Sequence, residues 1–307
     1  MSIVDILKSN KVNTLNQIAL LCGCPIWSTV KSERILGIKS SIDFYDRLDL
    51  KNSKRTTLSI DVGIKNFSYC KSTGGSFPLT ITEWDKINLN ERYGGSYATM
   101  LHQESLLDKK RYLNHITSHV VDDKLIPWAD LVVIESQRTR SNNNSATLPN
   151  VFLNHTLESL IFSKRYPGLI IPMTSNQMIS FWFNRFISPD SMKKLKTKAT
   201  RMELAYNWID VLFTLPNFNS QLTNANLLEY LELDAKQKTD DLIDSLLYNL
   251  TINCSIGHLT ELLNWIENGQ HLTEFVDEKN KFHLQLINPI VDKYDLKLKE
   301  EFKRLVV

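Results

Sequence analysis

The run Leu-Val-Val-Ile-Glu at residues 131–135 constrains the fold of this 307-residue chain more than any other segment. Four consecutive apolar residues, three of them β-branched, are typical of a strand that is buried on both faces. Such strands lie in the middle of parallel sheets that helices cover on both sides. Glu135 follows the run directly, and an acid at the end of a buried strand needs a partner or a function.

Apolar periodicity predicts the elements around this strand. Three strands precede it, at 56–60, 66–71 and 79–84, with a hairpin connection at 72–76. The remaining predictions are helices at 97–121, 148–164, 193–213 and 239–250 and a short strand at 169–172. An antiparallel meander followed by parallel strands and crossover helices predicts an α/β fold. The order matches ribonuclease H-like topology, a mixed five-stranded sheet flanked by helices.

The first fifty residues are predicted to form a small helical extension. Apolar spacing indicates helices at 14–21 and 29–36, joined by the turn Cys22-Gly23-Cys24-Pro25. The polar stretch 47–55 is a plausible linker. We therefore predict an extension at 1–50 and a main domain at 54–307, which ends in a C-terminal helical extension. The Asn-rich segment 216–229 is predicted to be a loop insertion.

Charge is unevenly distributed along a chain whose formal net charge is only +2. Residues 136–202 contain ten Lys or Arg residues and two acids, which indicates a surface that binds a polyanion. The four cysteines are too scattered for a disulfide framework or a zinc site. No apolar run reaches transmembrane length, so we expect no membrane association, and no targeting peptide is evident.

Carboxylates stand where the predicted sheet would gather them. Asp61 closes the first strand, Glu135 closes the fourth, and Asp240, Asp241 and Asp244 begin the last predicted helix. At about 100° per residue, the three aspartates can share one helix face. Hydrolysis of a phosphodiester needs an activated water and a neutralised leaving oxygen, and two Mg²⁺ ions held by such carboxylates supply both. A metal also explains how a cluster of like charges is tolerated.

Each of these acids also has a purely structural interpretation. Acids in a first helical turn complement the helix dipole, which alone would account for Asp240 and Asp241. An aspartate before Val-Gly is an ordinary turn residue, which alone would account for Asp61. The joint arrangement of all five acids is what favours a metal-dependent active site.

Three motifs resemble a known family. The strings SIDVGIKNFSY (59–69), VVIESQRTRS (132–141) and KQKTDDLIDSLL (236–247) are similar to those of the fungal mitochondrial Holliday junction resolvases. These cruciform-cutting endonucleases of yeasts are relatives of the bacterial resolvase RuvC. The resemblance runs in order from about 54 to 250. The unit at about 14–41 is similar to the small SAP-like helical motif of some members, although a plain structural helical pair remains an alternative.

The resemblance implies a homodimer that nicks two opposed strands of a four-way DNA junction with Mg²⁺ or Mn²⁺, two ions per site. It implies metal ligands at Asp61, Glu135, Asp241 and Asp244, with Asp240 a close alternative to Asp241. It also implies action in the mitochondrial matrix on DNA rather than on a small molecule. Where the family often has two lysines before the Asp pair, this chain has Lys238-Thr239, which leaves a role for such a lysine in doubt.

Candidate DNA-binding residues surround these acids in the sequence. An Arg beside a metal site can clamp a phosphate, and a basic helix can follow a DNA backbone. The candidates are Gln137, Arg138, Arg140, Lys193, Lys194, Lys196, Lys198, Lys236 and Lys238. Three alternative functions stay open at this point: another nuclease of the same fold acting on RNA–DNA hybrid or structured RNA, an actin-like phosphotransferase, and a non-catalytic DNA-binding module. The full acidic set argues against the last, and the absence of a second phosphate-binding Asp-x-Gly argues against the phosphotransferase.

Overall fold

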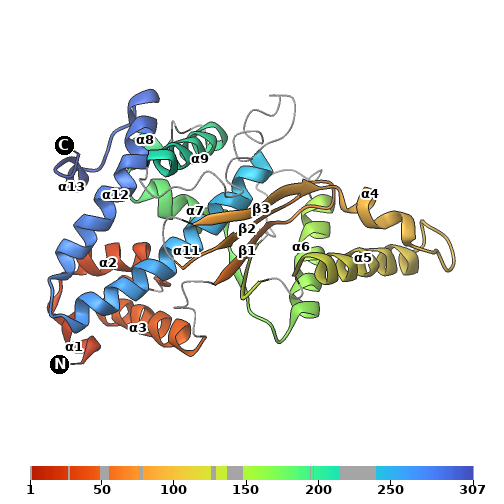
Figure 1. Cartoon of the computed structure of the whole chain (residues 1–307), viewed down its shortest axis with the longest axis horizontal. Helices are drawn as coiled ribbons and strands as arrows, with labels where there is room; N and C mark the ends of the chain where they lie inside the picture. The colour runs from red at the N-terminus through yellow and green to blue at the C-terminus, as the bar shows by residue number, and fades with distance from the viewer. Residues whose placement is uncertain are drawn as a thin grey trace.

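The computed structural model describes residues 2–26, 28–48, 55–75, 79–125, 129–136, 148–193, 195, 197–214 and 240–306. A five-stranded sheet lies at the centre, with helices against both of its faces (Figure 1). The strands are β1 (Thr56–Asp61), β2 (Phe67–Thr73), β3 (Thr80–Ile87), β4 (Leu131–Glu135) and β5 (Ile170–Met173). Their order across the sheet is β3-β2-β1-β4-β5.

The sheet is mixed, as predicted. The meander β1-β2-β3 is antiparallel, whereas β4 pairs with β1 in parallel and β5 pairs with β4 in parallel. Ile60 is opposite Ile134 in the parallel pair, so the next residues, Asp61 and Glu135, leave the sheet at the same edge. The two strands thus bring together two acids that are 74 positions apart in the sequence.

Alternation along β4 divides its buried side chains between two hydrophobic cores. Val132 and Ile134 belong to the core beneath α5 (Leu106–Val120) and α6 (Leu148–Arg165). Leu131 and Val133 belong to the core on the other face. That face is covered by α7 (Ser175–Ile179), η3 (Ser180–Asn184), α9 (Thr197–Thr214), α11 (Asp240–Glu267) and α12 (Leu272–Lys293). Helices on both faces explain why the predicted run is apolar at every position.

Helix α11 is the central helix, and it crosses the strands in Figure 1. It is buried on nearly every side along its 28 residues, as expected for a helix enclosed by a sheet and other helices. The prediction ended this helix at 250, but it continues for 17 further residues. The sequence after 250 is rich in Thr, Asn, Cys and Ser, and these polar residues are buried against the rest of the molecule.

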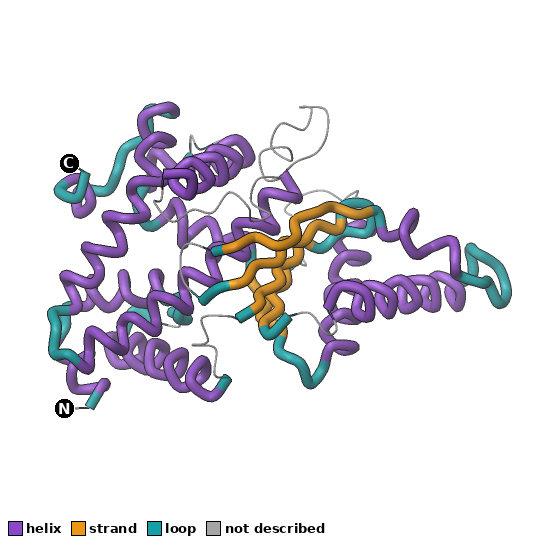
Figure 2. Tube along the Cα trace, viewed as in Figure 1, coloured by secondary structure: helices purple, strands orange, loops and turns teal. Residues whose placement is uncertain are grey.

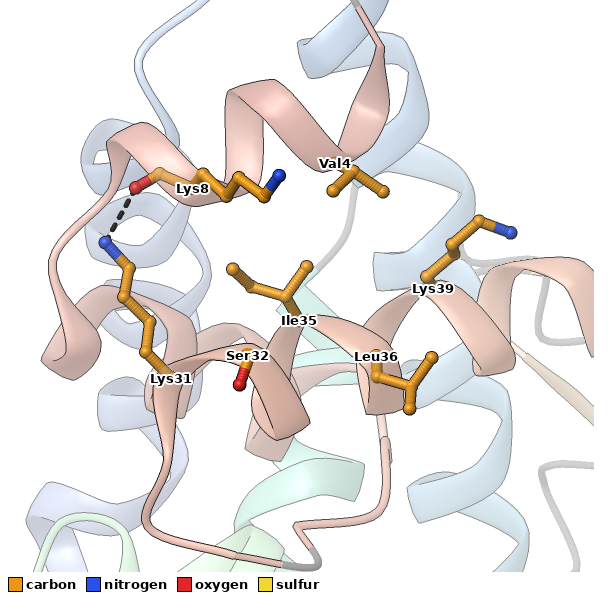
Figure 3. Close-up of a pocket in the computed structure, with 7 residues that line it drawn as sticks. All are labelled: Val4, Lys8, Lys31, Ser32, Ile35, Leu36 and Lys39. Carbon is orange, nitrogen blue, oxygen red and sulfur yellow. Dashed lines mark hydrogen bonds between the residues drawn. The ribbon is translucent and has the colours of Figure 1, made fainter.

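The N-terminal helices are α1 (Ile3–Ser9), α2 (Val12–Leu21) and α3 (Lys31–Arg47). Only the second was predicted near its full length. The three share a hydrophobic core with α11 and α12, which includes Leu259, Leu262 and Phe275. An open apolar groove lies between α1 and α3, and its rim carries Lys8 and Lys31, with the Lys31 ammonium bonded to the carbonyl of Lys8 at 2.6 Å (Figure 3).

Two predicted helices begin later than expected. The helix predicted at 97–121 begins at Leu106, because Asp108 accepts hydrogen bonds from the backbone of residues 100–102 and holds that segment outside the helix. The helix predicted at 193–213 begins at Thr197, and Lys193 lies in the turn after α8 (Pro189–Met192).

Short elements complete the fold: α4 (Leu89–Tyr93), η1 (Gly94–Ser96), η2 (Val121–Leu125) and α13 (Glu300–Lys303). In Figure 2 the orange strands lie between two groups of purple helices. Within the described ranges, no helix is both long enough and apolar enough to span a bilayer. The loop predicted at 216–229 and the core of the predicted linker, 49–54, lie outside the described residues.

Candidate active site

Two acids from neighbouring strands form the base of the site. Alternation along β1 and β4 points Asp61 and Glu135 to the face that α11 covers, because Ser59 and Val133, two residues earlier in each strand, face that side. Asp61 is only 9% exposed, and Glu135 is half-buried. A pair of carboxylates so far from water needs a proton or a cation between its members.

The first turns of α11 bring two more acids to this edge. Asp241 and Asp244 lie three positions apart and therefore share a helix face. The pKa of Asp61 is raised well above its usual value, first by burial, then by a hydrogen bond with Glu135 and by the charges of Glu135, Asp244 and Asp241. The structure thus brings together four of the five predicted acids.

A ladder of buried hydrogen bonds fixes the position of α11 on the sheet. Ser59 Oγ donates to the carbonyl of Ser245 at 2.6 Å, one residue after Asp244. One turn further on, the Asn249 amide donates to the carbonyls of Thr57 and Cys70 at 3.2 and 2.9 Å. The ladder continues through Asn253, which accepts from the Arg55 guanidinium at 2.7 Å. These contacts set which α11 residues stand beside the strand ends.

Asp244 is the α11 acid with the most unusual environment. Burial raises its pKa to about 7; the Arg201 guanidinium opposes this rise, while the charges of Glu135, Asp241 and Asp240 add to it. Arg201 Nη1 donates to Asp244 Oδ2 at 2.8 Å. The other carboxylate oxygen, Oδ1, is buried and has no hydrogen-bond partner among the described residues. An unsatisfied carboxylate oxygen beside three other acids is a ready ligand for a cation.

Asp240 faces a different neighbour. It forms an ion pair with Lys198 of α9. Burial acts to raise the pKa of Asp240, but the hydrogen bond and charge of Lys198 outweigh it, and the pKa is lowered. Asp240 therefore already has its counter-charge on α9, whereas Asp241 acts electrostatically on Asp61.

Tyr248 is a site residue that the sequence analysis missed. Its ring is fully buried one turn after Asp244, and its hydroxyl has no hydrogen-bond partner among the described residues. Burial and the charges of Glu135, Asp61 and Asp244 raise its pKa, so the phenol stays protonated. The spacing Asp241, Asp244, Tyr248 on one helix face was the signal that could have found it.

The donor set suits a hard divalent cation. All candidate ligands are carboxylate oxygens, which Mg²⁺ and Mn²⁺ prefer to nitrogen or sulfur. Across the described ranges, however, no three Asp, Glu, His or Cys side chains already surround a common point at metal-binding distance. The residues fit such a cation in chemical type and in the sheet edge that they share.

The structure separates the predicted DNA-binding residues. Lys198 lies on α9 and pairs with Asp240, while Lys193 is 82% exposed and within 4.0 Å of Asp190. The prediction that these two lysines share one basic helix is wrong, because Pro189 starts a separate short helix before Lys193. Seven candidates lie outside the described residues: Gln137, Arg138, Arg140, Lys194, Lys196, Lys236 and Lys238.

Residues 57–262, from β1 through most of α11, match the family described as mitochondrial resolvase Ydc2 / RNA splicing MRS1. The chain belongs to this family. The matched segment contains all five acids and every ladder residue except Arg55, but not helices α1 to α3. The sequence resemblance to mitochondrial junction resolvases is thereby confirmed.

Relatives of the family resemble this chain over most of its length. The mitochondrial cruciform cutting endonuclease 1 of Saccharomyces cerevisiae is 23% identical, over 91% of this chain and 89% of the relative. The protein of the same name from Schizosaccharomyces pombe is 25% identical, over 62% of this chain and 74% of the relative.

A solved structure of the family confirms the fold. The crystal structure of the yeast mitochondrial Holliday junction resolvase Ydc2 superimposes with a TM-score of 0.52 at 17% identity, over 84% of this chain and 99% of that chain. The predicted ribonuclease H-like class, with its mixed five-stranded sheet and N-terminal helices, is therefore correct.

Proposed function

We propose that this protein is an endonuclease of mitochondria that resolves four-way (Holliday) DNA junctions by paired, symmetric nicks. The observation that carries the proposal is the meeting of Asp61, Glu135 and the α11 acids at one sheet edge, in a chain of the resolvase family. The names of the two endonuclease relatives support the same class of substrate and the same compartment.

Membership of a resolvase nuclease family implies a divalent metal, and we propose two Mg²⁺ or Mn²⁺ ions held by Asp61, Glu135, Asp241 and Asp244. Such ions activate the attacking water and neutralise the charge on the leaving oxygen. The buried, unsatisfied Oδ1 of Asp244 and the all-oxygen donor set support this assignment. Asp240 assists from the margin of the site, because Lys198 already balances its charge.

Side chains around the acids can take the remaining roles, which are to accept a proton, bind the phosphate and donate a hydrogen bond. The hydrogen bond between Asp61 and Glu135 needs one of the two carboxyls to be protonated. Once a cation displaced that proton both would be ionised, and the pair could then accept a proton from the attacking water. Arg201 and Lys198 stand beside the acids on α9 and can transfer their hydrogen bonds from carboxylates to a bound phosphate. The Tyr248 hydroxyl remains protonated and can donate a hydrogen bond to oxygen atoms that enter the site.

Junction DNA is proposed to lie over this sheet edge and along the basic segment 136–202. Among the described residues, the exposed side chain of Lys193 after α8 supports this path for the DNA. Gln137, Arg138 and Arg140 lie within five residues after Glu135 in the sequence, and Lys236 and Lys238 lie within four residues before the Asp pair, so all five are proposed to bind nearby phosphates. Lys194 and Lys196 are proposed to extend the same basic surface.

A homodimer is proposed because paired nicks on opposed strands need two sites. Helix α6 exposes a stripe of aromatic rings: Phe152 is 71% exposed, Phe162 46%, and Tyr166, just beyond the helix, 78%. At about 100° per residue these three positions lie within about 80° of one another. Large exposed aromatic side chains on one face are typical of a protein interface.

One experiment tests the proposal directly. The purified protein is incubated with Mg²⁺ and a synthetic four-way DNA junction, a linear duplex, an RNA–DNA hybrid and a four-way RNA junction. We expect rapid cleavage of the DNA junction alone. The family description also names RNA splicing, and preferential cleavage of the hybrid or the RNA junction would assign the site to RNA instead.

A further inference from the structure

A cleft opens from the acidic site toward α5 and α6. Its volume is about 650 Å³, which lies within the range of small-molecule binding pockets. Its lining includes Asp61 and Asp241 of the acidic site together with Leu113 of α5 and Leu153 of α6. None of the proposed catalytic steps uses the lining residues from α5 and α6, so this part of the cleft is available to a part of the substrate next to the reacting phosphate.

The cleft is lined by amide side chains from three different elements. Asn66 comes from the turn after β1, Asn90 from α4 and Asn154 from α6. Asn90 Oδ1 accepts a hydrogen bond from the Tyr112 hydroxyl at 2.8 Å, which turns its amide nitrogen away from that contact. Asparagine amides present a donor and an acceptor together, the pattern that reads base edges.

The remaining lining groups match the other parts of a nucleotide. Tyr112 contributes an aromatic ring and Leu153 an aliphatic side chain that is 38% exposed, and both kinds of surface accept a stacked base. Lys65 and Lys109 are cations suited to a sugar-phosphate backbone. Lys109 Nζ lies 2.7 Å from Glu104 Oε2 in an exposed ion pair, which a phosphate could replace.

We infer that this cleft binds one unstacked nucleotide of the cut strand, next to the phosphate at the acidic site, and that Asn154 and Asn90 contact its base. The inference rests on the proposed nuclease function and adds to it a base-specific subsite. A base can reach the cleft only after it leaves the helical stack, and this costs least where pairing is already disturbed. Pairing is disturbed at the branch point of a junction, so a base there can enter the cleft more easily than a base in a linear duplex. The subsite would therefore favour junctions over linear duplex.

The test compares intact and abasic substrates. A tetrahydrofuran abasic residue is placed in turn at each of the positions that flank the mapped cut. When the abasic residue stands at the position that occupies the cleft, wild-type protein should cleave the junction about tenfold more slowly than the intact junction. This is the decrease expected when stacking and an amide hydrogen bond are removed. Asn154→Ala removes the amide hydrogen bond but leaves the stacking surfaces of Tyr112 and Leu153, so the ratio of the two rates should fall but stay above one.

Matched variants separate base contact from general damage. Asn114→Ala removes an amide from the exposed side of α5 and should keep the wild-type ratio. Lys65→Gln should slow cleavage of the intact and the abasic junction by the same factor, because it removes a phosphate contact and not a base contact. Thermal unfolding of each variant checks that it is folded.

A second readout does not depend on cleavage. 2-Aminopurine at the same position should brighten when wild-type protein binds in Ca²⁺, and should brighten less with Asn154→Ala. Unchanged abasic ratios in Asn154→Ala, or equal fluorescence changes, overturn the subsite. Fluorescence that responds as described without cleavage of any junction would overturn the nuclease proposal and leave the subsite standing.

Discussion

Arg201 Nη1 and Asp244 Oδ2 are 2.8 Å apart, with the two side chains only 11% and 16% exposed. The pair joins α9 to the first turns of α11 across 43 positions of sequence. A partly buried carboxylate that keeps one oxygen in such a bond and the other unsatisfied is balanced between a fixed cation of the protein and a cation from solution. The site's chemistry should therefore respond strongly to substitution at either residue.

The four clustered acids should be needed for cleavage but not for junction binding. Asp61→Asn, Glu135→Gln, Asp241→Asn and Asp244→Asn should each lower the cleavage rate by more than about a hundredfold, because even removal of a group that supports a metal ligand costs about 10- to 100-fold. Binding should persist or strengthen, since each change removes repulsion toward phosphate. Gel shifts in Ca²⁺ and single-turnover cleavage in Mg²⁺ measure the two effects.

Asp240→Asn distinguishes the two members of the Asp pair. Its ion pair with Lys198 predicts a much smaller decrease in cleavage than for Asp241→Asn. Asp292→Asn, an exposed acid on α12, serves as the charge-matched control and should behave as wild type. Equal decreases in the Asp240 and Asp241 variants would contradict the assignment of Asp241 as the ligand.

The metal requirement should depend on pH. The pKa of Asp244 is raised to about 7, so below that pH a proton competes with the metal for the carboxylate. The Mg²⁺ concentration for half-maximal cleavage should therefore rise as the pH falls from 8 to 6. Arg201→Gln removes the cation that opposes the rise in the pKa of Asp244. In this variant the increase in the Mg²⁺ requirement should therefore begin at a higher pH. Metal titrations at several pH values test the shift, and a wild-type requirement that is flat across this range would contradict it.

Asp244→Asn should stabilise the metal-free protein at pH 8. A carboxyl whose folded pKa lies above its unfolded value binds protons more readily in the folded state, so its contribution to stability falls as the pH rises from about 4 through 7. An amide does not ionise and avoids this decrease. The shift in the pKa of Asp244 is worth about 1.4 kcal/mol of unfolding free energy for each pKa unit. The net gain of the variant should be smaller than this full amount, roughly 1–2 kcal/mol in total, because Arg201 loses its partner.

Urea unfolding at pH 5 and pH 8, with and without Mg²⁺, measures this effect. The variant's advantage should be present at pH 8 and shrink at pH 5, where the wild-type carboxyl is protonated. Mg²⁺ should stabilise the wild-type protein by mass action and the variant much less. An advantage of the same size at both pH values would mean that packing, and not ionisation, is responsible.

An element of this fold could be predicted from the sequence where its own neighbouring residues determine it, and could not where contacts with distant residues determine it. The strand at 131–135 was predicted to the residue, because burial on both faces imposes a continuous apolar run. Helix α11 was cut short because many residues after 250 are polar. Asn253 is one of them, and it is buried because it accepts hydrogen bonds from Arg55 and Thr57 at the sheet. The start of α5 was placed too early because the capping bonds of Asp108 are invisible to periodicity.

The acids of the site were found from the sequence for a similar reason. Asp61 and Glu135 end strands that the pattern identifies, and the α11 acids share a helix face by spacing alone. Arg201 and Lys198 were recognised as basic residues, but their pairing with Asp244 and Asp240 depends on how α9 crosses α11, which no local pattern encodes. Tyr248 was overlooked because a tyrosine in an apolar helix is ordinarily a core residue.

The aromatic stripe on α6 should hold the proposed dimer together. Phe152→Ser and Phe162→Ser together should convert the protein to a monomer at micromolar concentration, since they remove large exposed apolar surface and leave the fold's core intact. Sedimentation velocity measures the mass, and a plasmid with an extruded cruciform reports paired nicks as linear DNA. A monomeric variant should yield mainly nicked circles. A double variant that remains a dimer would place the interface elsewhere.

The N-terminal helices are predicted to bind duplex arms through the lysines beside the α1–α3 groove (Figure 3). Deletion of residues 1–50 would expose Leu259, Leu262 and Phe275, so point substitutions are the appropriate test. Lys8→Gln and Lys31→Gln should weaken binding to all DNA forms. Each should flatten the slope of log affinity against log salt by up to about 0.9 for every phosphate that no longer binds a lysine. The cleavage preference for junctions over linear duplex should persist, because selectivity is proposed to lie in the dimeric core.

A variant of opposite sign provides the control for this surface. Asp43 pairs with Lys39 at 2.5 Å on the exposed side of α3, so Asp43→Asn releases a lysine and removes a negative charge. If DNA passes over these helices, this variant should bind slightly more tightly and show a steeper salt dependence. Fluorescence anisotropy over a salt series measures both changes. Slopes that are unchanged in the lysine variants and in Asp43→Asn would show that the arms of the junction pass over another face of the molecule.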